Sequence, residues 1–408
     1  MANEPIRPLI SESSTSESTT VDVVLSDMRD KTVTIPDYQR DGDQWEEPTK
    51  SLLIESVINN LTIPAFFFET FKEEEIEKNA VVDGQQRLST LFEFHQNKLR
   101  LVSSDEAPYL SPSSVHYAGK TYDELPASFQ QTFKKYRLTI IKLRDLGDMR
   151  LEVFRRINQG GTPLSAQDIR LAYYGDGSSA VAFIRLAGIY DAERPAAKRF
   201  IETASGKYGI SFPWENHLGL ETWRDWWEGK EIAKGQTASE MFLWSLVAAQ
   251  VDKLNSLLEN AEALARINCR FKRAVDEALD AYCAQLKYQA ANPDSERLLM
   301  ETNELRERFF PHFGEWIEFL LGQKGISIQV PKNRLVAALI GAAYDANVRA
   351  SSLSDQQWTN VVEFVRRPQD VARRLAFEWP VSKGRWDGKK GYRAQLQAAR
   401  DAIGKLCG

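Results

Sequence analysis

Val81-Val82-Asp83-Gly84-Gln85-Gln86-Arg87-Leu88-Ser89-Thr90-Leu91 is the most informative stretch of this chain, because two β-branched residues lead into a polar turn that opens onto an apolar helical pattern. A helix that begins at this turn presents unpaired backbone N–H groups and a partial positive charge. Such a helix start is a favourable place for an anion. The stretch therefore predicts a strand, a turn and a helix, with a phosphate site at the turn.

Three residues of this turn suit phosphate chemistry. Gly84 allows the backbone to approach a ligand closely, and Arg87 offers a planar fork for phosphate oxygens. Asp83 is a candidate metal ligand, because Mg²⁺ prefers one or two carboxylates together with phosphate oxygens. In the structural alternative, Asp83 only caps the helix, Gly84 only makes the turn and Arg87 is solvated.

Two further segments lie on either side of this turn in the sequence. Upstream, Ile35-Pro36-Asp37-Tyr38-Gln39-Arg40 is followed by Trp45, and downstream lies Phe154-Arg155-Arg156-Ile157-Asn158-Gln159-Gly160-Gly161-Thr162-Pro163-Leu164-Ser165. In this order the three segments resemble the N-terminal domain family of GmrSD-type modification-dependent restriction enzymes. The family pattern is I-P-x-Y-Q-R, D-G-Q-Q-R and F-x-R-I-N-x-G-G-x-x-L, and the resemblance covers residues 21–175.

The resemblance implies a ParB/sulfiredoxin-like α+β fold in which the D-G-Q-Q-R turn binds nucleotide phosphates. It also implies nucleoside triphosphate hydrolysis, which several members perform, and a place in bacterial defence against phage DNA. The positions that match the family pattern are Tyr38, Gln39, Arg40, Asp83, Gly84, Gln85, Gln86, Arg87, Arg156 and Asn158.

The roles of these matched residues are our inference. We expect Gln85 or Gln86 to orient an attacking water. Arg87 and Arg156 are expected to neutralise the charge that develops on the phosphoryl oxygens. The resulting site would hold Mg²⁺ through Asp83 and a nucleoside triphosphate through the whole turn.

Structural alternatives exist for the remaining matched residues. Tyr38 and the nearby Trp45 are amphipathic aromatics, which commonly close the edge of a core rather than stack on a base. In the structural alternative for Arg40, its side chain only pairs with an acidic neighbour. Asn158, just before two glycines, suits the left-handed conformation that ends many helices.

The sequence around these segments predicts interleaved helices and strands, as an α+β domain requires. Glu46-Glu47-Pro48 marks a helix start, and apolar residues then recur at helical spacing up to Leu61. Strands are expected over residues 63–68 and 137–143, with a helix over residues 125–136 between them. Ser165 and Asp168 have the spacing of a capping box at the start of another helix.

The length of 408 residues suits two domains. Residues 1–20 are polar and of low complexity, so we expect a disordered lead-in that lacks the apolar core of a signal peptide. Residues 21–180 are expected to form the ParB-like nucleotide-binding domain, and residues 181–408 a helical domain with a basic C-terminal segment. No run approaches the ~18–20 apolar residues needed to span a bilayer, so we expect a soluble protein without a membrane partner.

Helical periodicity dominates the second half of the chain, for example over residues 251–286, and residues 335–344 suit a buried helix segment. Nine of the ten tryptophans lie in this half. Among them, Trp223, Trp226 and Trp227 share one helical face by their spacing. Core packing is the favoured explanation, and a base-stacking platform is the alternative.

Positive charge gathers near the C-terminus although the chain has a net charge of −5. Residues 363–408 contain eleven Lys/Arg against five Asp/Glu, a net of +6, which leaves −11 for residues 1–362. Cations alternate with aromatic residues here, as on a surface that tracks phosphates and stacks bases, and the candidate nucleic-acid contacts are Lys383, Arg385, Lys389, Lys390 and Arg393. The alternative is a solvated face or an intramolecular partner for the acidic body.

Several common chemistries lack their signatures in this sequence. There is no G-x-x-x-x-G-K-[ST] loop, no G-x-G-x-x-G fingerprint and no H-E-x-x-H pair. Three scattered cysteines offer no disulfide framework and suit a reducing cytoplasm. Many relatives of the resembled family carry a C-terminal His-Asn-His nuclease, but none of the four histidines here lies in such a motif. If the chain belongs to a DNA-cleaving system, we expect the nuclease to be a separate subunit, or the effect to be something other than cleavage by that chemistry.

These observations favour a nucleotide-binding, nucleotide-hydrolysing sensor or regulator in anti-phage defence or DNA restriction, with Mg²⁺ and a nucleoside triphosphate as cofactors and DNA as a further partner. One alternative is a non-catalytic module that binds a nucleotide or a DNA phosphate only to set its conformation. The other is a metal-dependent nuclease that nicks DNA through Asp83 and nearby acids.

Overall fold

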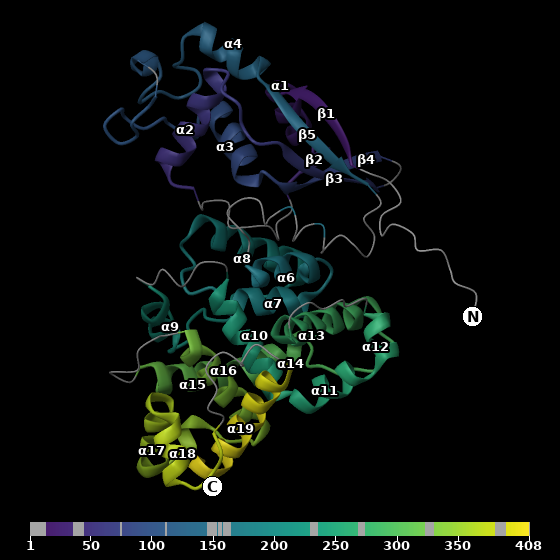
Figure 1. Ribbon diagram of the computed structural model, residues 1–408, viewed down its shortest axis with the longest axis vertical. Coiled ribbons are helices and arrows are strands. Elements are labelled where there is room, and N and C mark those ends of the chain that lie inside the picture. The colour runs from purple at the N-terminus through teal and green to yellow at the C-terminus, as the bar shows by residue number, and fades with distance from the viewer. Residues whose placement is uncertain are drawn as a thin grey trace, which may run out of the picture. The chain divides into compact units, whose positions relative to one another are not determined.

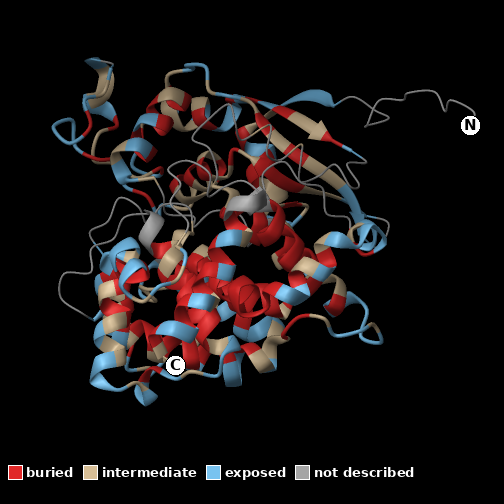
Figure 2. Ribbon diagram, turned by 60° about the horizontal axis from the view of Figure 1, so that its bottom comes forward, coloured by how far each residue is buried: buried red, intermediate tan, exposed pale blue. Residues whose placement is uncertain are grey.

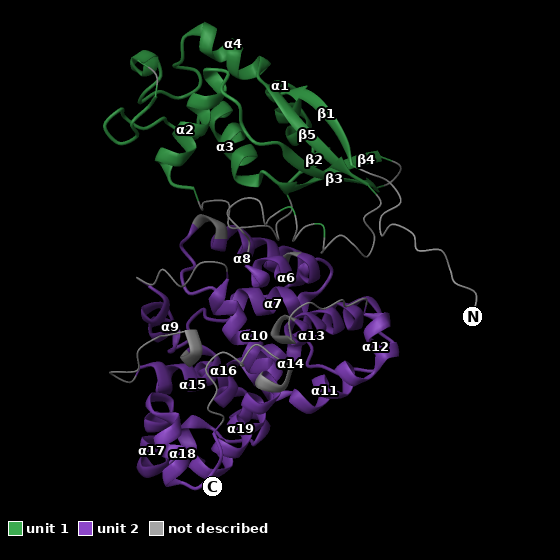
Figure 3. Cartoon of the chain, in the orientation of Figure 1, with its two compact units in different colours: residues 1–164 green, residues 165–408 purple. Residues whose placement is uncertain are grey.

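The computed structural model describes residues 14–35, 45–73, 76–110, 112–144, 165–228, 236–267, 274–322, 330–379 and 389–407, together with positions 153 and 157. The chain divides into two compact units, residues 1–164 and residues 165–408 (Figure 3). Unit 1 combines a sheet with helices, and the described part of unit 2 is helical (Figure 1). The α+β fold class with a mainly helical second part is confirmed.

The described residues of unit 1 form a five-stranded mixed sheet in the order β1-β5-β3-β4-β2. The strands are β1 (Thr15–Thr20), β2 (Val33–Thr34), β3 (Phe66–Glu73), β4 (Ile76–Asp83) and β5 (Arg137–Leu143). The neighbouring pairs β1–β5 and β3–β4 are antiparallel, whereas β3–β5 and β2–β4 are parallel. The predicted strand over residues 137–143 is therefore β5, next to the centre of the sheet.

Strand β1 corrects the expectation of a disordered lead-in over residues 1–20 for Thr15–Thr20, while residues 1–13 lie outside the described residues. Thr15–Thr20 pair with β5 along their whole length, with Thr20 opposite Arg137. Side chains strengthen the ladder, because Lys142 lies 3.1 Å from Glu17 and Arg137 donates to Ser18. A polar segment can form such an edge strand since the backbone supplies the hydrogen bonds.

Helices supply the core of unit 1. They are α1 (Val21–Arg29), α2 (Glu47–Ile58), α3 (Gln85–His95) and α4 (Ala127–Lys135), with a 3₁₀ turn, η1, at Pro112–His116. Apolar residues of these helices pack together with alternate residues of the strands, including Phe66, Phe68 and Val81, in one hydrophobic cluster. Between α2 and α3 an ion pair joins Lys50 to Glu93 at 2.9 Å.

Unit 2 contains helices whose bounds are α6 (Ala166–Gly175), α7 (Ser179–Ala187), α8 (Pro195–Tyr208), α9 (Leu220–Trp227), α10 (Thr237–Ala249), α11 (Val251–Glu259), α12 (Ala261–Arg266), α13 (Ala274–Ala291), α14 (Thr302–Glu304), a π-helical turn η4 (Leu305–Phe309), α15 (Phe310–Leu321), α16 (Val330–Asp345), a 3₁₀ turn η5 (Ala350–Ser352), α17 (Asp355–Arg366), α18 (Pro368–Arg374) and α19 (Lys389–Cys407). Helix α10 is buried along almost its whole length, and Figure 2 shows buried residues gathered on the inner helices of this unit.

Aromatic residues fill the core of unit 2. Trp223, Trp226 and Trp227 are buried, and Trp214 stacks on Trp223 with ring centroids 5.4 Å apart. The core-packing explanation for the tryptophan cluster therefore holds, since a base-stacking platform would be accessible. The periodic stretch 251–286 is divided among α11, α12 and α13, with a break at Asn260, whose side chain caps α12.

The two units divide between residues 164 and 165, whereas the boundary expected from the sequence lay after residue 180. Helix α6 begins at Ala166 with the predicted Ser165–Asp168 capping box, and it belongs to unit 2. The physical reason is a buried ion pair in which Arg170 Nε on α6 lies 2.8 Å from Asp280 Oδ1 on α13. Among the described residues, no helix is both long and apolar enough to cross a membrane.

Candidate functional site

The turn between β4 and α3 is the structural form of the predicted strand–turn–helix. β4 ends at Asp83, Gly84 is the N-cap residue, and α3 begins at Gln85. Gly84 has φ of +96°, which L-residues with side chains rarely adopt. A Cβ at this position would lie 2.4 Å from Cδ1 of Phe66. Glycine is thus required by the backbone conformation and by the ring of β3 that packs on it.

The contacts of Arg87 differ from both expectations for its side chain. One expectation was a solvated guanidinium group, and the other was an open fork for phosphate oxygens. Its Nη2 donates to Asp83 Oδ2 at 2.8 Å, and its Nη1 donates to the carbonyl oxygens of Pro64 and, at 3.2 Å, of Ala65. The guanidinium carbon lies 4.7 Å from the ring centroid of Phe66. Only 11 % of the Arg87 side chain is exposed, so the fork is already used within unit 1.

The electrostatics of Arg87 follow from this packing. Burial lowers the pKa of the guanidinium, and the carboxylate of Asp83 opposes that shift through its charge and its hydrogen bond. Arginine remains charged in proteins, so the pair is a genuine ion pair. The Asp83 side chain is 35 % exposed and therefore presents the accessible end of this pair.

The two glutamines of the turn have different surroundings. Gln86 is 7 % exposed, and its backbone carbonyl accepts a 2.7 Å hydrogen bond from Thr90 Oγ1 in the next turn of α3. Gln85 is half-buried at the first position of the helix. Of the two residues predicted to orient a water, Gln85 is therefore the better placed to meet a ligand at the helix start.

The other predicted site residues fall into two groups. Tyr38, Gln39, Arg40, Arg156 and Asn158 lie outside the described residues. Trp45 is described and packs against the hydrophobic cluster of unit 1, as the core-edge alternative expects.

Metal binding at this site would depend on Asp83. Among the described ranges, no group of three or more His, Cys, Asp or Glu side chains is arranged to hold a metal ion. A single carboxylate fits Mg²⁺ only when phosphate oxygens complete the coordination. The donor set is thus compatible with a magnesium–nucleotide complex and offers no preformed cation cage.

In the basic C-terminal segment, α19 provides intramolecular partners. Arg393 Nη1 lies 3.4 Å from Glu259 Oε1, and Tyr392 is buried with its ring 6.2 Å from Trp244. Lys383 and Arg385 lie outside the described residues; Lys389 and Lys390 open the backbone of α19. Farther along the helix, Arg400 pairs with acidic residues of α11 and α16. The described contacts support the alternative in which the basic segment pairs with acidic residues of the same chain.

Sequence reasoning missed the ion pair of Arg170 and Asp280, which is 0 % and 1 % exposed. Arg170 also donates to Gln167 one turn earlier, and Gln167 donates to Ser239 at 3.2 Å. The only signal in the sequence is an arginine between the apolar residues Ile169 and Leu171. Its partner is far away in the chain, so periodicity alone does not identify the pair.

Comparison with known proteins gives one match. Residues 21–175 match the family model of the GmrSD restriction endonuclease, N-terminal domain. No curated protein and no solved structure matches the chain. The matched range contains the β4–α3 turn and extends into α6 of unit 2. It confirms the resemblance inferred from the three segments and associates this part of the chain with DNA restriction.

Proposed function

We propose that this chain is a nucleotide-binding, nucleotide-hydrolysing component of a DNA restriction system, and that the β4–α3 turn is its nucleotide site. The observation that supports this most is the position of Asp83. An ion pair with a largely buried arginine side chain fixes its partly exposed carboxylate at the start of α3. The turn lies inside the range that matches the restriction endonuclease domain.

Arg87 takes a different role in this proposal from the one expected from the sequence. Its donors hold Asp83 and the carbonyl groups of Pro64 and Ala65, so it is a positioning residue rather than a phosphate ligand. Phosphate oxygens would instead meet the backbone N–H groups of the first turn of α3, which carry the positive end of the helix dipole. Gln85 at that turn would orient the attacking water.

Asp83 would contribute one carboxylate oxygen to Mg²⁺, since Oδ2 is engaged by Arg87 and Oδ1 is the second oxygen of the group. A cation held there would supply neutralisation of phosphate charge while water attacks the terminal phosphorus atom, the bond from that atom to the bridging oxygen breaks, and the nucleoside diphosphate leaves. A direct DNA-nicking reaction through Asp83 is less well supported, because the described residues near it provide no further cluster of metal-binding acids.

DNA and a separate nuclease subunit are the partners that fit a chain without a His-Asn-His motif. The support for DNA is the family match over residues 21–175. In this scheme the nucleotide state of unit 1 would regulate the activity of the nuclease partner.

The proposal is tested by phosphate release from ATP, GTP, CTP and UTP with Mg²⁺, with and without DNA. We expect turnover of at least one nucleotide by the full chain, and loss of turnover in Asp83→Asn. Asp105→Asn is the matched control, because Asp105 is an exposed aspartate elsewhere in unit 1. Binding without turnover would favour the non-catalytic module. Turnover that is equal in both variants would refute the assignment of Asp83.

A further inference from the structure

A cavity in unit 2 has no role in the function proposed above. Its volume is about 500 Å³, and it lies where the start of α7, the end of α8, the end of α13 and the start of α14 meet. This volume suits a small organic molecule and is much larger than a single phosphate ion requires. All of its lining residues belong to unit 2, so it is separate from the β4–α3 turn.

The lining of this cavity divides into apolar and polar parts. Ile210, Leu286 and Pro293 provide apolar surface. Tyr208 is held in place by two hydrogen bonds of its hydroxyl group, which donates to Gly175 O and accepts from Gly177 N, each at 3.1 Å. This combination of apolar surface and a fixed aromatic ring suits a planar ring in the ligand.

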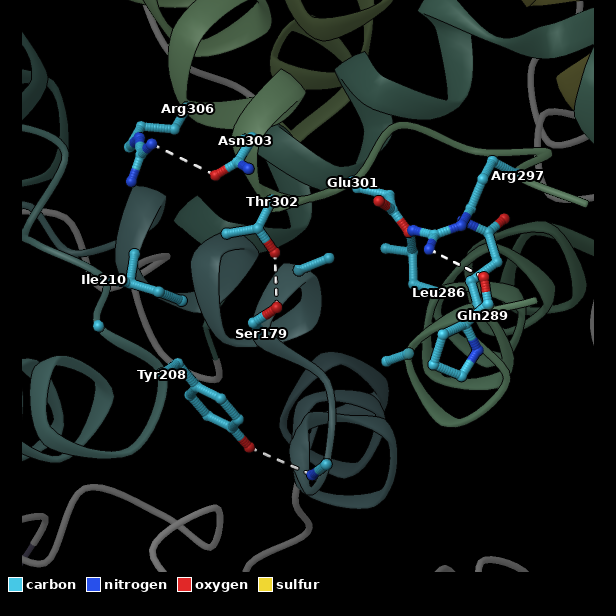
Figure 4. A pocket seen from close by; sticks show the side chains of 15 residues that line it. Ser179, Tyr208, Ile210, Leu286, Gln289, Arg297, Glu301, Thr302, Asn303 and Arg306 are labelled. Atoms are coloured by element: carbon cyan, nitrogen blue, oxygen red, sulfur yellow. Dashed lines mark hydrogen bonds and ion pairs between the residues drawn. The ribbon is translucent and has the colours of Figure 1, made fainter. Parts of the chain in front are cut away.

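Two arginines lie on either side of the Ser179–Thr302 hydrogen bond in the close view (Figure 4). Arg306 donates to Asn303 and pairs with its neighbour Glu307 at 2.8 Å. Arg297 pairs with Glu301, which lies four residues later in the chain.

The partners of both arginines are exchangeable. The Arg297 and Arg306 side chains are 46 % and 41 % exposed, and exposed ion pairs of this kind contribute little stability. Guanidinium groups form charge-assisted, frequently bidentate hydrogen bonds with phosphate, as they do with carboxylates. A phosphate group that enters the cavity can therefore replace Glu301 or Glu307 as their partner.

We propose that this cavity binds a phosphorylated small molecule of the size of a nucleoside monophosphate. Its ring would lie against Tyr208 and the apolar surface, and its phosphate would be held by Arg306. With Glu301 as the carboxylate among its lining residues, the site would bind the phosphate through arginine and would require no divalent cation.

The test is calorimetric titration of the full chain with AMP, GMP, CMP and UMP in EDTA, which removes the Mg²⁺ that the turn in unit 1 would need. We expect at least one nucleotide to bind. Arg306→Gln should weaken that binding at least ~tenfold, because a charged hydrogen-bond donor is lost. Arg308→Gln is the matched control, since Arg308 is a 72 % exposed arginine two residues away that does not line the cavity.

A second variant addresses the cavity itself. Ala290 is an exposed lining residue near the end of α13, so Ala290→Trp should occupy the space and abolish binding without disturbing the core. Asp83→Asn should leave monophosphate binding unchanged, which separates this site from the turn in unit 1. The proposal is overturned if no monophosphate binds, if Arg306→Gln and Ala290→Trp bind like the wild type, or if inorganic phosphate binds as tightly as the nucleotides.

Discussion

Arg87 holds three segments of unit 1 together through a single guanidinium group. It donates to Asp83 and to two carbonyl oxygens of the chain before β3, and it lies over the ring of Phe66. Removing it leaves these partly exposed acceptors without their donor. The residue is therefore important for stability, whatever ligand the turn binds.

We expect Arg87→Ala to reduce the free energy of unfolding by about 1.5–3 kcal/mol, the range for lost hydrogen bonds to a charged group. Urea denaturation measures this loss. Arg100→Ala is the control, because its ion pair with Glu124 is exposed and should contribute little stability. Equal, small losses in both variants would contradict the positioning role of Arg87.

Gly84 offers a second test at the same scale. Gly84→Ala places a residue with a side chain at φ of +96° and a Cβ 2.4 Å from Phe66. Gly119→Ala meets only the conformational penalty, because φ is +70° and nothing lies within 4 Å of the new Cβ. We expect Gly119→Ala to lose about 1–2 kcal/mol and Gly84→Ala clearly more.

The steric part of the Gly84 effect is separable from the backbone part. Gly84→Ala should cost less stability when it is made in the Phe66→Leu variant than when it is made in the wild type. Losses that simply add in the double variant would show that the ring does not limit the turn.

At the scale of elements, α6 is fixed in unit 2 by a fully buried ion pair between Arg170 and Asp280. Arg170→Ala should destabilise unit 2 by about 3–5 kcal/mol, because a buried carboxylate loses its partner. Arg170→Met combined with Asp280→Leu should recover part of this loss, since no unpaired charge remains. Thermal unfolding followed by circular dichroism distinguishes these outcomes, and a double variant no better than Arg170→Ala would contradict the account.

Between α15 and α16, His312 makes the stability of unit 2 dependent on pH. His312 is 6 % exposed, its Nε2 lies 3.1 Å from Ile340 O, and burial lowers its pKa to about 4. An unfolded histidine binds a proton below pH ~6.5, whereas the folded one does so only near its lowered pKa. Stability is therefore present above pH ~6.5 and is lost as the pH falls toward about 4.

Between pH 7 and pH 5 this histidine should account for a loss of roughly 2 kcal/mol. Because carboxylates also titrate on acidification, the informative quantity is the difference between the wild type and His312→Gln in urea unfolding at both pH values. The variant should lose less stability than the wild type. Identical losses would show that folding does not lower the pKa of His312.

The strength of each local signal determined which elements were predictable. β5 is rich in apolar residues that alternate only in its first half, and the prediction over residues 137–143 matches its bounds. β1 has no apolar pattern in Thr15–Thr20, because its stability comes from pairing with β5 across a large separation in sequence. The stretch 251–286 has one periodicity, yet the structure divides it where the Asn260 side chain caps a new helix.

At the scale of the whole molecule, the turn and its family were predictable from the sequence. Which residue of the turn meets a ligand and which one positions another residue was not. Asp83, Gly84 and Arg87 lie close together in the chain, so their common location was predictable. The partners of Arg87 at Pro64 and Ala65 become neighbours only when β3 and β4 pair. Tertiary contacts of this kind decide whether an arginine binds a ligand or positions another residue.

The central claim is that Asp83 in unit 1 binds a magnesium–nucleotide complex. It is tested most directly by calorimetric titration of the full chain and of Asp83→Asn with ATP, GTP, CTP and UTP, each with and without Mg²⁺. We predict Mg²⁺-dependent binding of at least one nucleotide to the wild type and affinity lower by about ten- to hundredfold in Asp83→Asn, because a charged ligand is lost. Absence of binding to the wild type, or equal affinity in the variant, would contradict the claim.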